Sequence, residues 1–265
     1  MNRLSIFHHH VLDFAKVRGL PIVKALAETR ALGFDGLVTE LSLLARGDGI
    51  EQLLDDNGLS VHAIFAGIDF IHEDRSVCAR RTGELLEAAN RCKADSVLIL
   101  PGLFREGDDT GTGIDRIFEG LSEACRLAAP IGIDVTIENF GLPGAPNGTI
   151  AGCQMVLDNV PELKFTFDTG NFSCFGEDPH VAYGRLRDRM VFVHLKDHPS
   201  GPNGPDPAVE APIGDGALKL GHLVRRMLDD GYTGGFVVEH FGHPDQGAAM
   251  RRSASFCHHI LGGRP

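Results

Sequence analysis

The order of apolar and helical segments constrains the fold of this chain more than any other feature of its sequence. Short β-type runs occur at residues 3–8, 34–40, 59–65, 95–101, 132–138, 163–168, 190–196 and 234–239. Segments with helical spacing follow them at about 19–32, 47–57, 75–92, 112–131, 149–158, 178–187, 217–230 and 244–261. The runs are rich in Val, Ile, Leu and Phe, which is typical of parallel strands covered on both faces. Eight β-then-α units without a composition break predict an α/β fold, the closed (β/α)₈ or TIM barrel.

The length of the chain agrees with this architecture. A (β/α)₈ barrel takes about 250 residues, and this chain has 265, so we expect residues 1–265 to form a single domain. The rival is an open, doubly wound sheet, which would carry a glycine-rich phosphate loop after its first strand. Here the first β-type run leads into His8, His9 and His10 instead. The barrel is therefore favoured.

Composition narrows the classes of partner. The formal charge is −11, from 25 basic and 36 acidic residues, which argues against nucleic acid as the main partner. No apolar run is long enough for a membrane span, and the N-terminus lacks the pattern of a signal peptide. The six cysteines are widely spaced and form no CxxC pair, so we interpret them as reduced thiols. We expect a cytoplasmic protein.

Side chains of types that can bind a metal ion stand near the ends of the last four β-type runs. They are Glu138, Asp168, His194 and Glu239. In a barrel these ends surround one mouth, so the four groups converge although they are far apart in sequence. Three carboxylates at one mouth repel each other, and a divalent cation removes that repulsion. The set favours Mn²⁺ and also suits Mg²⁺, Co²⁺ or Zn²⁺. The alternative, a separate local hydrogen bond for each group, explains less well why all four strands share the pattern.

Other polar residues near the expected mouth are candidates for substrate binding. His62 lies within the third β-type run, and Glu40 ends the second. Lys196 follows His194 by two residues, so strand alternation places both on one face. Asn171 follows Asp168 in a Gly-Asn turn sequence. For these candidates a core histidine, a loop cap, a surface lysine and a turn residue remain the alternative interpretations.

Two segments are longer than simple connections. Residues 139–148 follow the fifth β-type run, and residues 197–216, rich in proline and glycine, follow the seventh. Both lie on the carboxyl side of their strands, where barrel enzymes keep their active sites. We interpret them as lids or substrate walls.

The strand-end motifs resemble those of the xylose-isomerase-like barrel superfamily, especially its sugar (phosphate) isomerase/epimerase group of ketose 3-epimerases, hydroxypyruvate isomerase and inosose dehydratase. The matching segments are Thr-Ile-Glu-Asn at 136–139, Phe-Asp-Thr-Gly-Asn at 167–171, His-Leu-Lys-Asp at 194–197 and Val-Glu at 238–239. The resemblance implies that the four strand-end groups bind one metal ion.

The resemblance also implies a reaction. Glu138 and Glu239 would flank the substrate carbon and transfer its proton. The implied activity is an isomerase or epimerase of a small polyhydroxylated carbonyl compound, such as a sugar or keto-polyol. The reaction would proceed by proton abstraction next to a metal-bound carbonyl, through an enediolate. A homo-oligomer is a further expectation from this group.

Two departures from the subfamily patterns keep other functions open. Asn171 stands where ketose 3-epimerases carry a histidine, and no arginine follows His194 closely. Asn171 also disfavours the endonuclease branch, which needs additional histidine ligands. The His-Leu-Lys-Asp sequence at 194–197 is more similar to inosose dehydratase, which makes a lyase (dehydratase) acting on a keto-inositol or related keto-sugar at the same metal site the first alternative. A non-catalytic sugar-binding barrel is the second.

Overall fold

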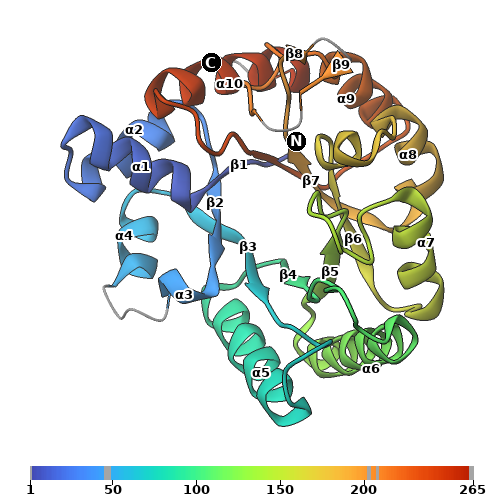
Figure 1. Ribbon diagram of the computed structural model, residues 1–265. Coiled ribbons are helices and arrows are strands. Elements are labelled where there is room, and N and C mark those ends of the chain that lie inside the picture. The colour runs from blue at the N-terminus through green and yellow to red at the C-terminus, as the bar shows by residue number, and fades with distance from the viewer. Residues whose placement is uncertain (1, 45–48, 202–203, 207–208, 263–265) are drawn as a thin grey trace.

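Parallel pairing closes the strands into a ring, as Figure 1 shows for the computed structural model, which describes residues 2–44, 49–201, 204–206 and 209–262. The barrel strands are β1 (Leu4–Phe7), β2 (Gly36–Glu40), β3 (Ser60–Gly67), β4 (Ser96–Leu100), β5 (Asp134–Glu138), β6 (Lys164–Asp168), β7 (Met190–Leu195) and β10 (Gly235–Val238). Their spatial order is β1-β10-β7-β6-β5-β4-β3-β2. Every neighbouring pair is parallel, which confirms the predicted (β/α)₈ barrel.

Helices surround the barrel as an outer layer (Figure 1). They are α1 (His8–Arg18), α2 (Ile22–Ala31), α3 (Leu41–Leu44), α4 (Ile50–Asp56), α5 (Arg75–Cys92), α6 (Thr110–Ala128), α7 (Ile150–Asn159), α8 (Pro179–Leu186), α9 (Leu220–Asp229) and α10 (Gln246–Leu261). Short 3₁₀ turns are η1 (Ala129–Ile131), η2 (Asn171–Phe175) and η3 (Arg187–Arg189), and a small hairpin pairs β8 (Ser200–Gly201) with β9 (Gly204–Pro205). Among the described helices, none has the length and apolarity that crossing a membrane requires.

The structure corrects the expected start of the helical layer. The first β-type run was expected to reach residue 8, but β1 ends at Phe7 and α1 begins at His8. This helix was not expected, because its histidines look like polar groups at a strand end. His10, Val11 and Phe14 are in fact buried on its inner face. The expected helix at 47–57 begins at Ile50, and residues 47 and 48 lie outside the described residues.

Strand alternation divides the buried side chains between two hydrophobic clusters. The larger cluster lies between the strands and the helices and includes Ile137, Phe167, Val193 and Val238. The smaller cluster is built from strand residues of the opposite parity: Phe7, Val38, Ala63, Phe192 and Val237. Because side chains alternate along a strand, this second set points into the barrel. Residues two positions further along the same strands therefore also point inward, at the mouth.

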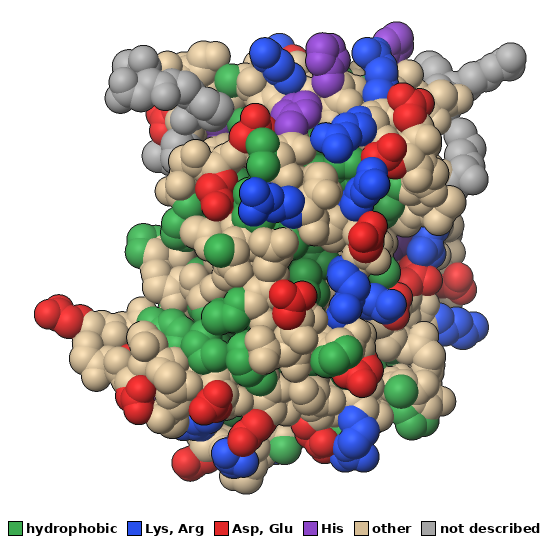
Figure 2. All heavy atoms as spheres, turned by 90° about the vertical axis from the view of Figure 1, so that its right-hand side faces the viewer, with side chains coloured by type: hydrophobic (Ala, Val, Ile, Leu, Met, Phe, Trp, Pro, Cys, Tyr) green, Lys and Arg blue, Asp and Glu red, His purple; other side chains and the backbone are tan. Residues whose placement is uncertain are grey.

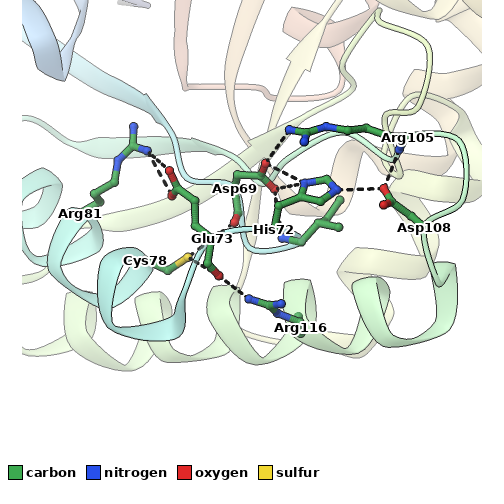
Figure 3. Close-up of polar contacts among 9 residues, drawn as sticks. Asp69, His72, Glu73, Cys78, Arg81, Arg105, Asp108 and Arg116 are labelled. Carbon is green, nitrogen blue, oxygen red and sulfur yellow. Dashed lines mark hydrogen bonds and ion pairs between the residues drawn. The ribbon is translucent and has the colours of Figure 1, made fainter.

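Polar contacts join the loops on the carboxyl side of β3 and β4 (Figure 3), and a backbone hydrogen bond joins the loop after β4 to the loop after β5. His72 Nδ1 lies 2.8 Å from Asp69 Oδ2, and His72 Nε2 lies 2.9 Å from Asp108 Oδ2. The hydrogen bond to Asp69, with that to Asp108, raises the pKa of His72. The Phe104 N–H donates to the Gly144 carbonyl over 2.9 Å. The rim of the mouth is thus held together by contacts between successive loops.

The outer surface is mixed in charge. Over the face that carries α7 and α8, Figure 2 shows acidic and basic side chains side by side, with small apolar areas between them. Charged groups of both signs on an exposed helical face are what amphipathic helices leave toward water. The unusual concentration of charge in this protein lies inside the barrel mouth instead.

Candidate metal centre

Three of the expected ligands converge at the mouth. Glu138 ends β5, Asp168 ends β6, and His194 stands in β7 directly opposite Asp168 in the strand register. One ligand atom from each of the three lies within 4.8 Å of the others, and all three residues are buried. The convergence follows from strand alternation, since each group stands two positions beyond an inward-facing residue of its own strand.

His194 lies between two glutamates. Its Nδ1 is 3.0 Å from Glu138 Oε2 and 3.4 Å from Glu239 Oε2. Burial disfavours the protonated imidazole, but the two carboxylates outweigh it and raise the pKa of His194 to about 10. The glutamates therefore attract positive charge to this position, which without a metal ion is a proton on His194.

Glu239 lies beside the three-residue group rather than within it. Its Oε1 is 2.5 Å from the Lys196 ammonium, which also lies 3.4 Å from Asp168 Oδ2. Burial disfavours ionisation of Glu239, but Lys196 and His194 outweigh it and lower its pKa to about 2. Burial raises the pKa of Asp168 to about 7, although Lys196 opposes that shift. The structure thus places the Lys196 ammonium among the carboxylates that were expected to bind a metal ion.

Two asparagines fix the orientation of Asp168 and Lys196. Asn139 Oδ1 accepts the Asp168 N–H, and Asn139 Nδ2 donates to the Asp168 carbonyl. Asn171 donates through Nδ2 to the Asn139 carbonyl, and its Oδ1 accepts from Lys196 Nζ at 3.0 Å. Asp168 Oδ1 accepts the N–H groups of Gly170 and Asn171, each at 2.8 Å. Asp168 therefore presents its other oxygen, Oδ2, to the site.

The donor set fits a divalent cation. Asp168 Oδ2 and His194 Nδ1 are buried, and neither has an aligned hydrogen-bond partner among the described residues. Ligand atoms about 2.0–2.3 Å from one ion lie within roughly 4.5 Å of each other, close to the 4.8 Å spread of the three donor atoms. Carboxylate oxygens with one imidazole suit Mn²⁺, Mg²⁺ or Zn²⁺.

The sequence did not single out Glu210, which the structure brings to the site. Its Oε1 lies 3.7 Å from Lys196 Nζ, its Oε2 is buried and has no hydrogen-bond partner in the described part of the chain, and burial raises its pKa to about 8. Glu210 belongs to the long segment after β7 and ends no strand, so strand periodicity gives no sign of it. The length of that segment was the only signal.

Asp197 anchors the segment that carries Glu210. Its Oδ1 accepts the N–H groups of His198 and Leu218, at 3.0 and 3.3 Å, and its Oδ2 accepts those of Gly214 and Gly216, both at 3.1 Å. A single buried carboxylate thus pins both ends of the expected lid at 197–216. Residues 202, 203, 207 and 208 of this lid lie outside the described residues.

The remaining candidates lie at different heights in the barrel. Glu40 ends β2 at the rim, and its Oε2 is 3.4 Å from His9 Nε2. His62 is buried near the start of β3, where its Nδ1 is 2.5 Å from Ser5 Oγ. Burial lowers the pKa of His62 to about 4. The structure brings Asn171 and Lys196 to the candidate metal centre, keeps Glu40 at the rim, and places His62 toward the opposite end of the barrel.

Aromatic rings form one wall of the mouth beside His194. The Phe7 ring meets the His194 ring edge-on, with centroids 5.0 Å apart. Phe65 and Phe241 lie 5.7 and 5.5 Å from Phe7, and Phe241 is 37% exposed. The mouth therefore offers an apolar surface next to a charged one, a combination that suits a polyol with C–H faces and hydroxyl groups.

Comparison with known proteins identifies the family to which this chain belongs. Residues 26–258 match the family model of the xylose isomerase-like TIM barrel. An inosose dehydratase of Lacticaseibacillus casei is 23% identical over 137 residues, which cover 47% of this chain and 46% of that relative. The chain therefore matches less than half the length of that protein. A putative L-ribulose-5-phosphate 3-epimerase of Escherichia coli is 26% identical over 206 residues, which cover 75% of this chain and 68% of the relative.

Solved structures share the fold at low identity. An L-ribulose 3-epimerase superposes with a TM-score of 0.80 at 17% identity, over 99% of this chain and 95% of its own. A xylose isomerase-like TIM barrel protein from Mycobacterium smegmatis in complex with magnesium gives 0.73 at 21% identity, over 90% and 87%. The IOLI protein with a bound zinc atom gives 0.76 at 14% identity, over 98% of each chain.

Proposed function

We propose that this chain, which belongs to the xylose isomerase-like TIM barrel family, is a divalent-metal-dependent isomerase or epimerase of a small sugar or keto-polyol. The observation that carries the proposal is the convergence of Glu138, Asp168 and His194 at the barrel mouth, with Glu239 beside them. The curated relatives include an epimerase and a dehydratase of polyhydroxylated compounds, which supports this substrate class. Among the metals that the donor set suits, Mn²⁺ is the first to test.

The proposed chemistry divides among the residues of the mouth. A bound divalent cation would supply the positive charge that acidifies a C–H group next to a carbonyl. Glu138 and Glu239 approach His194 from β5 and from the end of β10, and in the proposed reaction one of these carboxylates removes the proton. In an epimerase the other carboxylate returns a proton on the opposite face. In an isomerase the same carboxylate returns the proton to the adjacent carbon.

Lys196 and Asn171 prepare the site for this transfer. In the metal-free site the ammonium of Lys196 lies 2.5 Å from the Glu239 carboxylate and keeps it ionised, as a general base requires, until a metal ion takes over that positive charge. Asn171 holds the ammonium from the other side over 3.0 Å. The aromatic wall at Phe7 and Phe241 offers a surface that would pack against the C–H face of a sugar.

A dehydratase is the second candidate, and Lys196 is the observation that favours it. Loss of a β-hydroxyl as water needs a proton donor near the leaving oxygen. A buried ammonium beside Glu239 meets that need, because the carboxylate removes the C–H proton while the ammonium protonates the departing hydroxyl. The sequence similarity to inosose dehydratase adds weight to this alternative.

Incubation in D₂O tests both functions. The metal-free protein is loaded with Mn²⁺, mixed with a panel of ketoses and keto-inositols, and followed by NMR. Deuterium at the carbon next to the carbonyl, without loss of water, supports the isomerase or epimerase, whereas an unsaturated product supports the dehydratase. A gently purified protein that holds less than about a tenth of an equivalent of divalent metal and takes up none would refute the proposal.

Matched variants test the proton-transfer pair. Glu138→Gln and Glu239→Gln should each abolish turnover, because glutamine cannot accept the proton. Glu162→Gln, which removes an exposed carboxylate just before β6, serves as the control. Near-normal turnover in either site variant contradicts the assigned role.

A further inference from the structure

The ammonium of Lys196 lies among the carboxylates that the proposed metal ion would use. It is 2.5 Å from Glu239 Oε1 and 3.4 Å from Asp168 Oδ2. Asn171 Oδ1, at 3.0 Å, completes its close partners, and Glu210 Oε1 lies farther away at 3.7 Å. A buried lysine is rarely left without paired charges, and this one is paired with two of the expected metal ligands.

We propose that Lys196 is a built-in competitor of the metal ion. Its ammonium neutralises Asp168 and Glu239 in the metal-free protein and moves toward Glu210 when a divalent cation binds. Lys196 and Glu210 would then set the metal affinity of this protein, in addition to the ligands themselves. The inference rests on the proposed function, because it takes the metal centre of that proposal as given.

Charge repulsion and the flexibility of the lysine side chain favour movement of the Lys196 ammonium from the carboxylates to Glu210. Two cations drawn to the same carboxylates a few ångströms apart repel each other strongly in a buried site. The lysine stem is flexible, so its ammonium can move without a change in the backbone. Glu210 offers a receiving position, because its Oε2 is buried and has no hydrogen-bond partner among the described residues.

The local packing leaves space for the lysine stem. A Cβ atom on Gly170 would lie 2.6 Å from Lys196 Cγ and 2.8 Å from Lys196 Cδ. Only glycine at this position lets the stem pass so close to the backbone that follows Asp168. The same backbone supplies the N–H groups that fix Asp168 Oδ1, so the lysine and the ligand share one support.

Titration of metal-free protein with MnCl₂ in a calorimeter tests the inference without any turnover assay. Lys196→Met should bind Mn²⁺ at least ~10-fold more tightly than the wild type, because the competing charge is gone. Lys164→Met is the matched control, since it removes the same charge at the opposite end of β6 and should change the affinity less than ~2-fold. Thermal melting of each variant establishes that it is folded.

Glu210→Gln provides the second arm, on a segment outside the barrel strands. It should weaken Mn²⁺ binding ~5-fold, because the displaced ammonium loses its receiving carboxylate. In a Lys196→Met background the same substitution should have a clearly smaller effect, since no ammonium remains to be received. If Lys196→Met does not fold, an unchanged affinity in Glu210→Gln alone overturns the inference.

The outcomes separate this inference from the proposed function. If wild-type protein binds Mn²⁺ and Lys196→Met binds it no more tightly, the competition is refuted while the metal site stands. If the effects of Lys196→Met and Glu210→Gln are simply additive, Glu210 acts as an independent charge, and the transfer of the ammonium is refuted. If neither the wild type nor any variant binds Mn²⁺, both proposals fall.

Discussion

Replacing Asp197 with asparagine should release the segment that carries Glu210. The Asp197 carboxylate is 1% exposed and accepts four backbone N–H groups within the segment or at its edges. Asparagine keeps one acceptor oxygen and turns an NH₂ group toward the other two donors. A hydrogen bond to a charged acceptor contributes about 1.5–3 kcal/mol, so losing two costs about 3–6 kcal/mol. Opening of the loop to water favours the lower end of that range.

The effect of Asp197→Asn should appear in stability and in local exchange. Urea unfolding should show the loss of stability, and hydrogen exchange should quicken at the amides of Gly214 and Gly216, which Asp197 Oδ2 holds. Asp215→Asn makes the same chemical change in the same segment. Asp215 forms an exposed ion pair with Arg252, so this control should cost less than about 1 kcal/mol. Equal effects of the two substitutions, or unchanged exchange at Gly214 and Gly216, would refute the anchoring role.

Further expectations concern metal, pH and backbone geometry. Mn²⁺ at about 100 times its dissociation constant should stabilise the fold by ~2.7 kcal/mol in thermal melts, and a chelator should reverse this. The raised pKa of His72 means that its ion pairs stabilise the fold fully below the ordinary histidine pKa and lose that contribution as the pH rises through the raised value. His72→Gln should therefore flatten the dependence of the unfolding free energy on pH from the ordinary histidine pKa upward; an unchanged slope contradicts this. Gly144→Ala should destabilise more than Gly107→Ala, because both have positive φ but only the Gly144 Cβ would meet a backbone oxygen, that of Phe104 at 2.3 Å.

The barrel could be predicted from the sequence because its strands repeat one physical pattern. Each strand is a short apolar run, and each predicted run overlaps an observed strand, with no end displaced by more than two residues. The first helix could not be read in the same way. His8 and His10 are buried in α1, and a buried histidine has no hydrophobic signature in the sequence. The helix became visible only through its packing, where His10 Nε2 accepts the His240 N–H.

The candidate site could be predicted only as far as strand ends define it. Parallel strands bring their carboxyl ends to one mouth, so position in a run was enough to group Glu138, Asp168 and His194. His62 shows the limit of this reasoning. It stands five residues before the end of β3 at Gly67, roughly 16 Å along the strand, and hydrogen bonds to Ser5 instead of reaching the mouth.

Strand periodicity does not account for the residues that reach the site from loops, whereas the need to compensate buried charge does. Three buried carboxylates cannot remain ionised together without compensating cations. In the described structure His194, which pairs with Asp168 in the strand register, and Lys196, which follows the end of β7, supply that compensation. If a metal ion takes its place, as proposed, Lys196 needs another partner, and Glu210 lies 3.7 Å from it on a segment that Asp197 holds through the N–H groups of Gly214 and Gly216. The proposed exchange then implies that the protein would fold with its own cations in the site and would replace one of them with the metal ion afterwards. This order of assembly requires that the metal-free protein unfolds as cooperatively as the metal-loaded protein. A metal-free protein that is unfolded at neutral pH would exclude it.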